Sequence, residues 1–203
     1  YGHGLDTAWL AHPRTQVVAV ADDDKVGLAR TVKRLKVDKA FSDFERMLDE
    51  VKPDIAAICS RWVDQHHKMA VAAAERGIHI YMEKPFCRTL EEADAIVQAC
   101  EKTHVKFALG HPTRYSPKLE TIRSLIKEGQ IGEVLEYRGR GKEDRRGGGE
   151  DLWVLGTHVM DMIRAIGGDP SGGFSEVRQG GQLVTKQHVK SGSEGIGSLA
   201  GDQ

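Results

Sequence analysis

Lys84 and His158 are the side chains of this sequence whose positions best suit acid–base chemistry. Lys84 stands in residues 82–85 (MEKP), directly after an apolar run, where an ammonium group can orient a hydroxyl or carbonyl and stabilise negative charge developing on oxygen. His158 and Asp161 are three residues apart in an otherwise apolar helical segment, so they share a helix face, as a base and its orienting carboxylate would. The alternatives are a solvated charge at Lys84, and a surface pair of Asp161 with Arg164.

A run of three aspartates, Asp22 to Asp24, follows another apolar run. A carboxylate at a strand tip, about 20 residues past a turn that carries Gly2 and Gly4, suits the 2′-hydroxyl of an NAD ribose. The 2′-phosphate of NADP would be repelled by this much negative charge, so NAD is the expected cofactor and Asp22 its ribose ligand. The alternative for Asp23 and Asp24 is a solvated turn in which Asp24 caps the next helix.

Alternating strands and helices must position these groups. Apolar, β-branched runs predict four buried strands, and the stretches between them have helical patterns. The predicted strands are residues 16–21, 54–59, 78–82 and 106–110, and the predicted helices are residues 4–11, 25–35, 43–51, 64–76 and 90–103. This alternation indicates a doubly wound parallel sheet of α/β class, in which ligands bind beyond the carboxyl ends of the strands. Thr89, with Glu92 at capping-box spacing, predicts the start of the last helix.

The pattern changes after residue 110. A helix is expected from Ser116 to Glu128, an alternating strand at 133–142, a helix at 152–166 and a strand-and-turn region at 174–185. We therefore expect two domains, residues 1–110 and residues 111–203, the second of them an α+β domain.

Composition excludes several classes of protein. The 29 basic and 30 acidic residues give a net charge of −1, and 39% of the residues are hydrophobic, so neither a nucleic-acid footprint nor wholesale disorder is expected. No apolar run reaches the length of a membrane span, so no membrane partner is expected. The three cysteines lie far apart, which argues against a disulfide framework or a zinc cage. We expect no metal, and a reducing setting such as the cytoplasm.

Four segments in this order resemble the Gfo/Idh/MocA oxidoreductases. They are the aspartate-tipped strand ending at Asp22, the E-K-P segment at 83–85, the G-H-x-x-R-Y segment at 110–115 and the G-x-H-x-x-D segment at 156–161. The resemblance implies an N-terminal Rossmann domain that holds NAD(P). It also implies a C-terminal domain whose mostly antiparallel sheet makes dimer or tetramer contacts, and hydride transfer at a hydroxyl carbon of a sugar or cyclitol.

Carried over by position, the resemblance gives roles to single residues. Lys84 would contact substrate and nicotinamide, His158 would be the substrate-contacting acid or base, and Asp22 would bind the adenosine ribose. Arg114 and Tyr115 would form part of the wall around the substrate and the nicotinamide. Besides what the resemblance carries over, we expect Gly2, Gly4, Trp62, His66 and Glu83 at the cofactor and Asp151 at the substrate.

The sequence departs from the family pattern at two places. Val154 stands where some members carry an aspartate four residues before the histidine, so Glu150 or Asp151 would have to substitute. The loop after the fourth strand, commonly T-P-N-x-x-H, reads Arg61 to His66 here and retains only the histidine. Trp62 in this loop either stacks on a ligand or covers the sheet edge.

Two other functions remain open at this point. One is an NAD-assisted glycoside-cleaving enzyme, and the other is a non-catalytic nucleotide-binding sensor or assembly subunit. We also expect the first strand of the Rossmann domain to precede Tyr1 and the C-terminal domain to be cut short, so the 203 residues alone are expected to be poorly stable and catalytically weak.

Overall fold

The computed structural model describes residues 5–60, 62–140, 155–185 and 188. The chain forms two compact units, Tyr1–Gly110 and His111–Gln203. Among the described residues, no helix combines the length and the apolar character that a membrane crossing requires.

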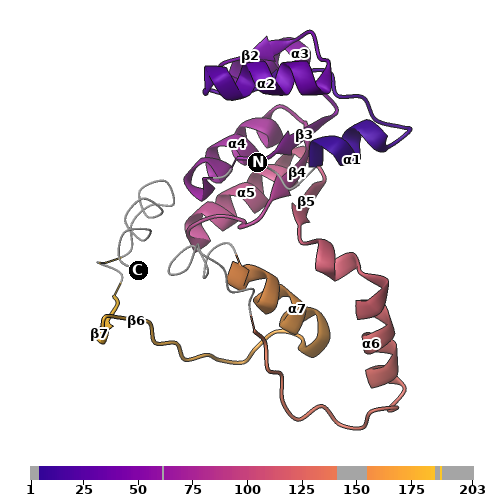
Figure 1. The fold of residues 1–203 in the computed structure, drawn as a ribbon, viewed down its shortest axis with the longest axis vertical. Helices are drawn as coiled ribbons and strands as arrows, with labels where there is room; N and C mark the ends of the chain where they lie inside the picture. Colours follow the sequence, from indigo (N-terminus) through magenta and orange to yellow (C-terminus); the bar gives the residue numbers. More distant parts are fainter. Residues whose placement is uncertain (1–4, 61, 141–154, 186–187, 189–203) are drawn as a thin grey trace. The chain divides into compact units, whose positions relative to one another are not determined.

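The first unit is built on three parallel strands in the order β3 (Ile55–Ile58), β4 (His79–Glu83) and β5 (Phe107–Gly110) (Figure 1). In the register, Ile58 lies beside Met82, and Met82 lies beside Leu109. The apolar runs at 54–59, 78–82 and 106–110 therefore form strands as predicted. Parallel strands need crossover connections, which α4 (Val63–Glu75) and α5 (Leu90–Thr103) provide.

A separate parallel pair joins β1 (Val20–Ala21) to β2 (Ala40–Phe41). The prediction of a strand over residues 16–21 is wrong for its first four residues, and β2 has no counterpart among the predicted strands. The shortened first strand and the unpredicted β2 have the same cause, because the parallel pairing between β1 and β2 extends over only two residues of each strand. A two-residue strand is too short to show a period of two in sequence.

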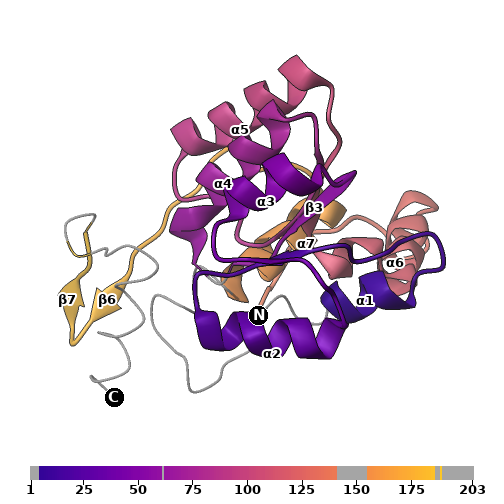
Figure 2. The same ribbon diagram turned by 90° about the horizontal axis from the view of Figure 1, so that it is seen from above.

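Helices cover both faces of β3–β5. Figure 2 shows α4 and α5 on one side of the strands and α1 (Leu5–Ala11) on the other, while α2 (Lys25–Leu35) packs against β1 and β2. Trp9 of α1 packs edge-to-face on Tyr81 of β4, with ring centroids 5.7 Å apart. The core formed by the sheet with α4 and α5 is rich in alanine, and Met82 and Ile96 are its largest fully buried hydrophobic side chains. These helices hold the strands from both sides, as in a doubly wound sheet.

Side chains define where three of the helices begin. The carboxylate of Asp24 accepts the backbone N–H groups of Val26 and Gly27 at the start of α2, and Asp43 does the same for α3 (Phe44–Val51). At α5, the Thr89 hydroxyl accepts the N–H of Glu92, as predicted. The Glu92 carboxylate accepts the N–H of Arg88 at 2.9 Å, one residue earlier than a capping box requires.

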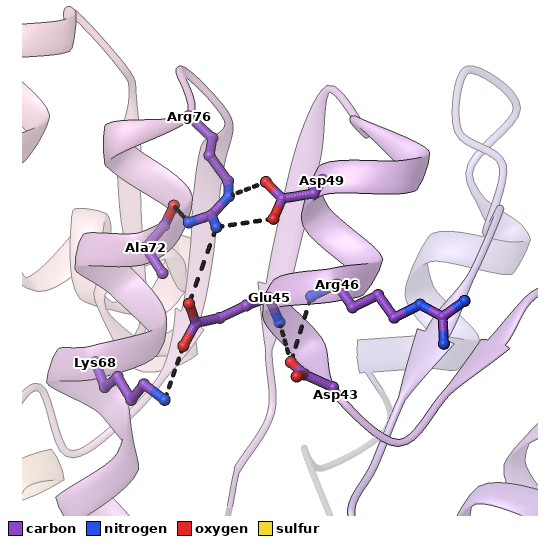
Figure 3. Close-up of polar contacts among 7 residues, drawn as sticks. All are labelled: Asp43, Glu45, Arg46, Asp49, Lys68, Ala72 and Arg76. Atoms are coloured by element: carbon purple, nitrogen blue, oxygen red, sulfur yellow. Dashed lines mark hydrogen bonds and ion pairs between the residues drawn. The ribbon is translucent and has the colours of Figure 1, made fainter.

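Ion pairs join α3 to α4 on the surface (Figure 3). The Arg76 guanidinium donates to both carboxylate oxygens of Asp49, at 2.6 and 3.1 Å, and also to the Ala72 carbonyl at 2.9 Å. Lys68 pairs with Glu45 at 2.7 Å. The hydrogen bond from Arg76 lowers the pKa of Asp49 below its ordinary value. The pair therefore stabilises the folded state while Asp49 is ionised, and this contribution is lost when the pH falls far enough to protonate Asp49.

The second unit contains a short 3-10 helix, η1 (Pro112–Tyr115), followed by α6 (Pro117–Lys127) and α7 (Thr157–Gly167). A hairpin of β6 (Arg178–Gln179) and β7 (Gln182–Leu183) confirms a strand-and-turn region in residues 174–185. Within the described residues of this unit, β6 and β7 form a two-stranded antiparallel sheet. The predicted helix at 152–166 lies partly outside the described residues.

The predicted strand at 133–142 is wrong for its described part, because residues 133–140 have no strand pairing. Leu135 is 87% exposed, so the alternation of apolar residues does not face a core here. The segment packs on α7 instead. A Cβ at Gly139 would meet a methyl carbon of Val159 at 2.3 Å, and a Cβ at Gly167 would meet the Tyr137 ring at 2.9 Å, so this contact requires glycine at both positions.

Candidate functional site

The carboxyl ends of β3, β4 and β5 bring several of the predicted residues to one edge of the sheet. The register places Glu83 beside Gly110, and it places Ile58, the residue before Cys59, beside Met82. Glu83 and Lys84 are each 7% exposed, which is unusual for charged side chains. The Glu83 carboxylate lies over Gly110, where an added Cβ would come within 3.5 Å of its Oε2. Charged groups this buried are typical of functional sites.

Cys59 follows β3 at the same edge. Burial, together with the negative charge of Glu83, raises the pKa of the Cys59 thiol to about 11. Its Sγ donates to the Ala57 carbonyl at 3.6 Å. The thiol is therefore protonated at neutral pH, and it indicates an environment of low polarity beside Glu83.

The loop after β3 turns into α4 around Ser60. The Ser60 hydroxyl accepts the N–H of Trp62 at 3.2 Å and also contacts the Gln65 side chain. Trp62 occupies the N-cap position of α4 and is half-buried. His66 is 0% exposed, and its two ring nitrogens lie on the carbonyl oxygens of Pro85 and Ser60, at 2.7 and 3.0 Å. This histidine, which was expected to contact the cofactor, is thus buried between the loops that follow β3 and β4.

Asp22 follows β1 and lies at the surface. Its Oδ1 accepts the N–H of Asp24 at 3.0 Å, and Asp24 in turn caps α2. The alternative prediction that Asp24 is a helix cap is therefore confirmed. A carboxylate offers about four acceptor positions, so Asp22 retains capacity for a hydroxyl donor such as a ribose.

In the second unit, η1 docks on α7 through two side-chain contacts. The rings of His111 and His158 pack edge-to-face with centroids 5.5 Å apart. One helical turn further along α7, the Asp161 carboxylate accepts from Arg114 Nε at 2.9 Å, and this hydrogen bond raises the pKa of Arg114. Tyr115 is 74% exposed. The two contacts fix the ring of His158 relative to η1.

The suggested surface pair of Asp161 with Arg164 is wrong. Arg164 bonds to Asp169, with Nε and Oδ1 2.7 Å apart, while Asp161 bonds to Arg114. The spacing of residues along α7 does not reveal a partner on another element, and Arg114 lies 47 residues earlier in the chain. Asp161, the carboxylate expected to orient His158, is thus the ion-pair partner of Arg114.

Several predicted site residues lie outside the described residues: Gly2, Gly4, Glu150, Asp151 and Val154. Two residues that contact the site residues were not assigned a role from the sequence. They are His111, which packs on His158, and Gln65, which contacts Ser60. His111 lies in the G-H-x-x-R-Y segment at 110–115, but its spacing from His158 in the sequence does not indicate that the two rings are in contact. Among the described residues, no group of three potential metal ligands comes together.

Comparison with protein families gives one match over the first unit. A model described as "Oxidoreductase family, NAD-binding Rossmann fold", named for GFO, IDH and MocA, matches residues 4–111. This range includes Asp22, His66, Glu83 and Lys84.

Curated relatives are similar over most of the chain. A levoglucosan dehydrogenase from Pseudarthrobacter phenanthrenivorans is 29% identical, over 78% of this chain and 44% of its own length. A scyllo-inositol 2-dehydrogenase (NADP(+)) from Bacillus subtilis is 26% identical, over 93% of this chain and 57% of its own. The chain spans about half the length of the curated relatives it matches.

Solved structures share the fold. A scyllo-inositol dehydrogenase from Lactobacillus casei, solved with NAD(H) and scyllo-inositol, superposes with a TM-score of 0.71 at 21% identity, over 81% of this chain and 51% of that one. An NAD binding oxidoreductase from Klebsiella pneumoniae gives a TM-score of 0.66 at 24% identity, over 82% of this chain and 48% of the other.

Proposed function

Because this chain belongs to the Gfo/Idh/MocA oxidoreductase family, we propose that it transfers a hydride between a hydroxyl carbon of a sugar or cyclitol and a nicotinamide cofactor. The observation that carries the proposal is the position of Lys84. It follows the middle strand β4 at the carboxyl edge of the sheet and is almost fully buried next to Glu83. A buried ammonium group at a strand end stabilises negative charge more strongly than a solvated one.

The residues that follow the carboxyl ends of β1, β3 and β4 offer groups that suit a nicotinamide dinucleotide. Asp22 offers a carboxylate for a ribose hydroxyl, and Asp23 and Asp24 add negative charge that disfavours a 2′-phosphate. We therefore propose NAD rather than NADP for this chain, although one relative is named for NADP(+). Glu83, Trp62 and the loop held by His66 complete the proposed cofactor wall, together with Gly2 and Gly4.

The mechanism assigns one task to each side chain. When bound, the cofactor supplies the hydride acceptor or donor. His158 removes the proton from the substrate hydroxyl, and Lys84 stabilises the negative charge that develops on that oxygen. Arg114, held by Asp161, contributes with Tyr115 and Asp151 to binding the substrate. The contact with His111 holds the His158 ring in one orientation.

Names of relatives support the substrate class. The similar proteins include dehydrogenases of levoglucosan, D-apiose, myo-inositol and scyllo-inositol. All of these molecules present several neighbouring hydroxyl groups. We propose a polyhydroxylated ring or sugar as the substrate here, a homo-oligomer as the working form, and the cytoplasm as the location. Thiols at Cys59, Cys87 and Cys100 support a reducing location, because all three are free.

The proposal is tested by incubating the complete protein, rather than these 203 residues alone, with NAD⁺ and a panel of sugars and cyclitols, and following absorbance at the wavelength of NADH. We expect stoichiometric NADH with at least one polyol. Cleavage of a glycoside without net NADH, or NAD⁺ binding without turnover across the panel, would contradict the proposal.

A further inference from the structure

His66 joins two loops that leave the carboxyl edge of the sheet. Its Nδ1 lies 2.7 Å from the carbonyl oxygen of Pro85, in the loop after β4, and its Nε2 lies 3.0 Å from the carbonyl oxygen of Ser60, in the loop after β3. The side chain is fully buried on the first turns of α4. A ring without exposed surface contacts no ligand directly, so its effect on the site must pass through these two loops.

Lys84 is held on both sides when His66 is in place. Glu83, the residue before it, belongs to the β4 ladder and lies beside Gly110. Pro85, the residue after it, accepts from the His66 ring. The next residue, Phe86, packs edge-to-face on Phe107 of β5, with centroids 5.4 Å apart. The backbone of Lys84 thus runs between two anchored neighbours, which limits where its ammonium group can point.

We propose that His66 is a positioning residue for Lys84, acting through a hydrogen bond from Nδ1–H to the Pro85 carbonyl, while Nε2 faces the loop after β3. This role rests on the function proposed above for Lys84. Carbonyl oxygens only accept hydrogen bonds, and a neutral imidazole carries one N–H, so the ring can donate to only one of its two carbonyl neighbours. The contact with Pro85, at 2.7 Å, is shorter than the contact with Ser60, at 3.0 Å, and we therefore place the proton on Nδ1. The bond is short and removed from water, where a lost donor leaves the carbonyl unsatisfied.

Two amide substitutions separate the two contacts. The amide nitrogen of asparagine can replace Nδ1 of histidine, whereas that of glutamine extends to the position of Nε2. His66→Asn therefore keeps a donor for Pro85, and His66→Gln keeps one for Ser60. His79→Gln is the matched control, since His79 lies at the amino end of the same strand and its Nδ1 accepts the N–H of Lys106 at 3.1 Å.

The activity experiment measures kcat and the NAD⁺ dissociation constant of the three variants in the full chain. A misplacement of about 1 Å lowers rates by roughly 100-fold, so we expect a fall in kcat of roughly 10- to 100-fold for His66→Gln, with NAD⁺ affinity changed little. His66→Asn should restore most of the lost turnover, and His79→Gln should turn over like the parent. Equal losses in His66→Asn and His66→Gln would overturn the proposal.

Two readouts do not depend on activity and so remain informative if the proposed function fails. Nitrogen-15 NMR of the histidine rings should show a proton on Nδ1 of His66. Hydrogen exchange in residues 86–88 should be faster in His66→Gln than in His66→Asn, because the loop after β4 is released. An unprotonated Nδ1, or equal exchange in the two variants, would contradict the positioning role even in an active enzyme.

Discussion

Lys84 and His158 carry the proposed chemistry at the level of single residues, and each can be removed separately. Loss of a positioned acid, base or electrostatic group lowers rates by about 10²–10⁴-fold. We expect Lys84→Met and His158→Ala each to lower kcat by that order in the full chain, while NAD⁺ binding, measured by calorimetry, survives. If His158→Ala retained full turnover, the base would lie elsewhere, with Glu150 and Asp151 as the next candidates.

The Cys59 thiol reports on the environment at the carboxyl edge. Its pKa of about 11 means that iodoacetamide should react slowly with Cys59 at pH 8 and faster only as the pH approaches that value. The unfolded chain ionises its cysteines near pH 8.5, so between that pH and about 11 the unfolded state binds fewer protons than the folded state. Stability should therefore fall as the pH rises through this window.

The measurement for Cys59 is mass-spectrometric labelling over a pH series, with urea unfolding of the parent and of Cys59→Ser at pH 8 and pH 10. The loss of stability between the two pH values should be smaller in Cys59→Ser. Rapid labelling of Cys59 at pH 8 in the folded chain would show that the thiol is not in the environment described.

The structural role of a residue can be predicted from the sequence where it depends on neighbouring residues in the chain. Asp24 caps α2, which the sequence can indicate because a cap depends only on the next few residues. The partner of Asp161 could not be predicted, because Arg114 reaches it from an element 47 residues away. The placement of His66 between two carbonyls depends likewise on how two loops meet, and no spacing rule encodes that.

At the level of elements, the docking of η1 on α7 depends on the bond between Arg114 and Asp161. Asp161 is nearly buried, so Asp161→Asn leaves the guanidinium with a weaker, uncharged partner. We expect a lower melting temperature and a lower kcat, because His158 lies one turn away on the same helix. Asp169→Asn is the matched control, since it removes an exposed partner of Arg164 beyond the end of that helix.

Circular dichroism melts and steady-state kinetics on the two variants test this element. The control should stay within about 0.5 kcal/mol of the parent in stability, as surface substitutions usually do. A control that lost as much stability and turnover as Asp161→Asn would show that the loss of Asp161 acts through general charge rather than through the contact with η1.

Strands and helices differ in how well the sequence predicts them. The helix Leu90–Thr103 begins and ends as predicted, because the Thr89 cap and the helical pattern agree. Residues 133–142 alternate as a strand would, yet the described part lies unpaired along α7. Alternation shows that a segment can be half-buried, but a strand also needs a ladder partner, and that partner is not encoded in the segment itself.

At the level of the whole molecule, the order of the motifs predicted the family before any contact was known. Each motif is weak alone, but Asp22, Glu83 to Pro85 and His158 appear in the order of the family, and the family model matches residues 4–111. Substrate, oligomeric state and location depend on parts of the molecule that these motifs do not describe.

The central claim is that a nicotinamide dinucleotide lies along the carboxyl edge of β3–β5 with its reactive ring beside Lys84. The most direct test is a crystal structure of the full chain with NAD⁺ bound, in which the distance from the nicotinamide ring to Lys84 Nζ is measured. We predict van der Waals or hydrogen-bonding contact between them, with the adenosine ribose on Asp22. A cofactor bound at the amino ends of the strands, near His79 and Arg76, would contradict the account.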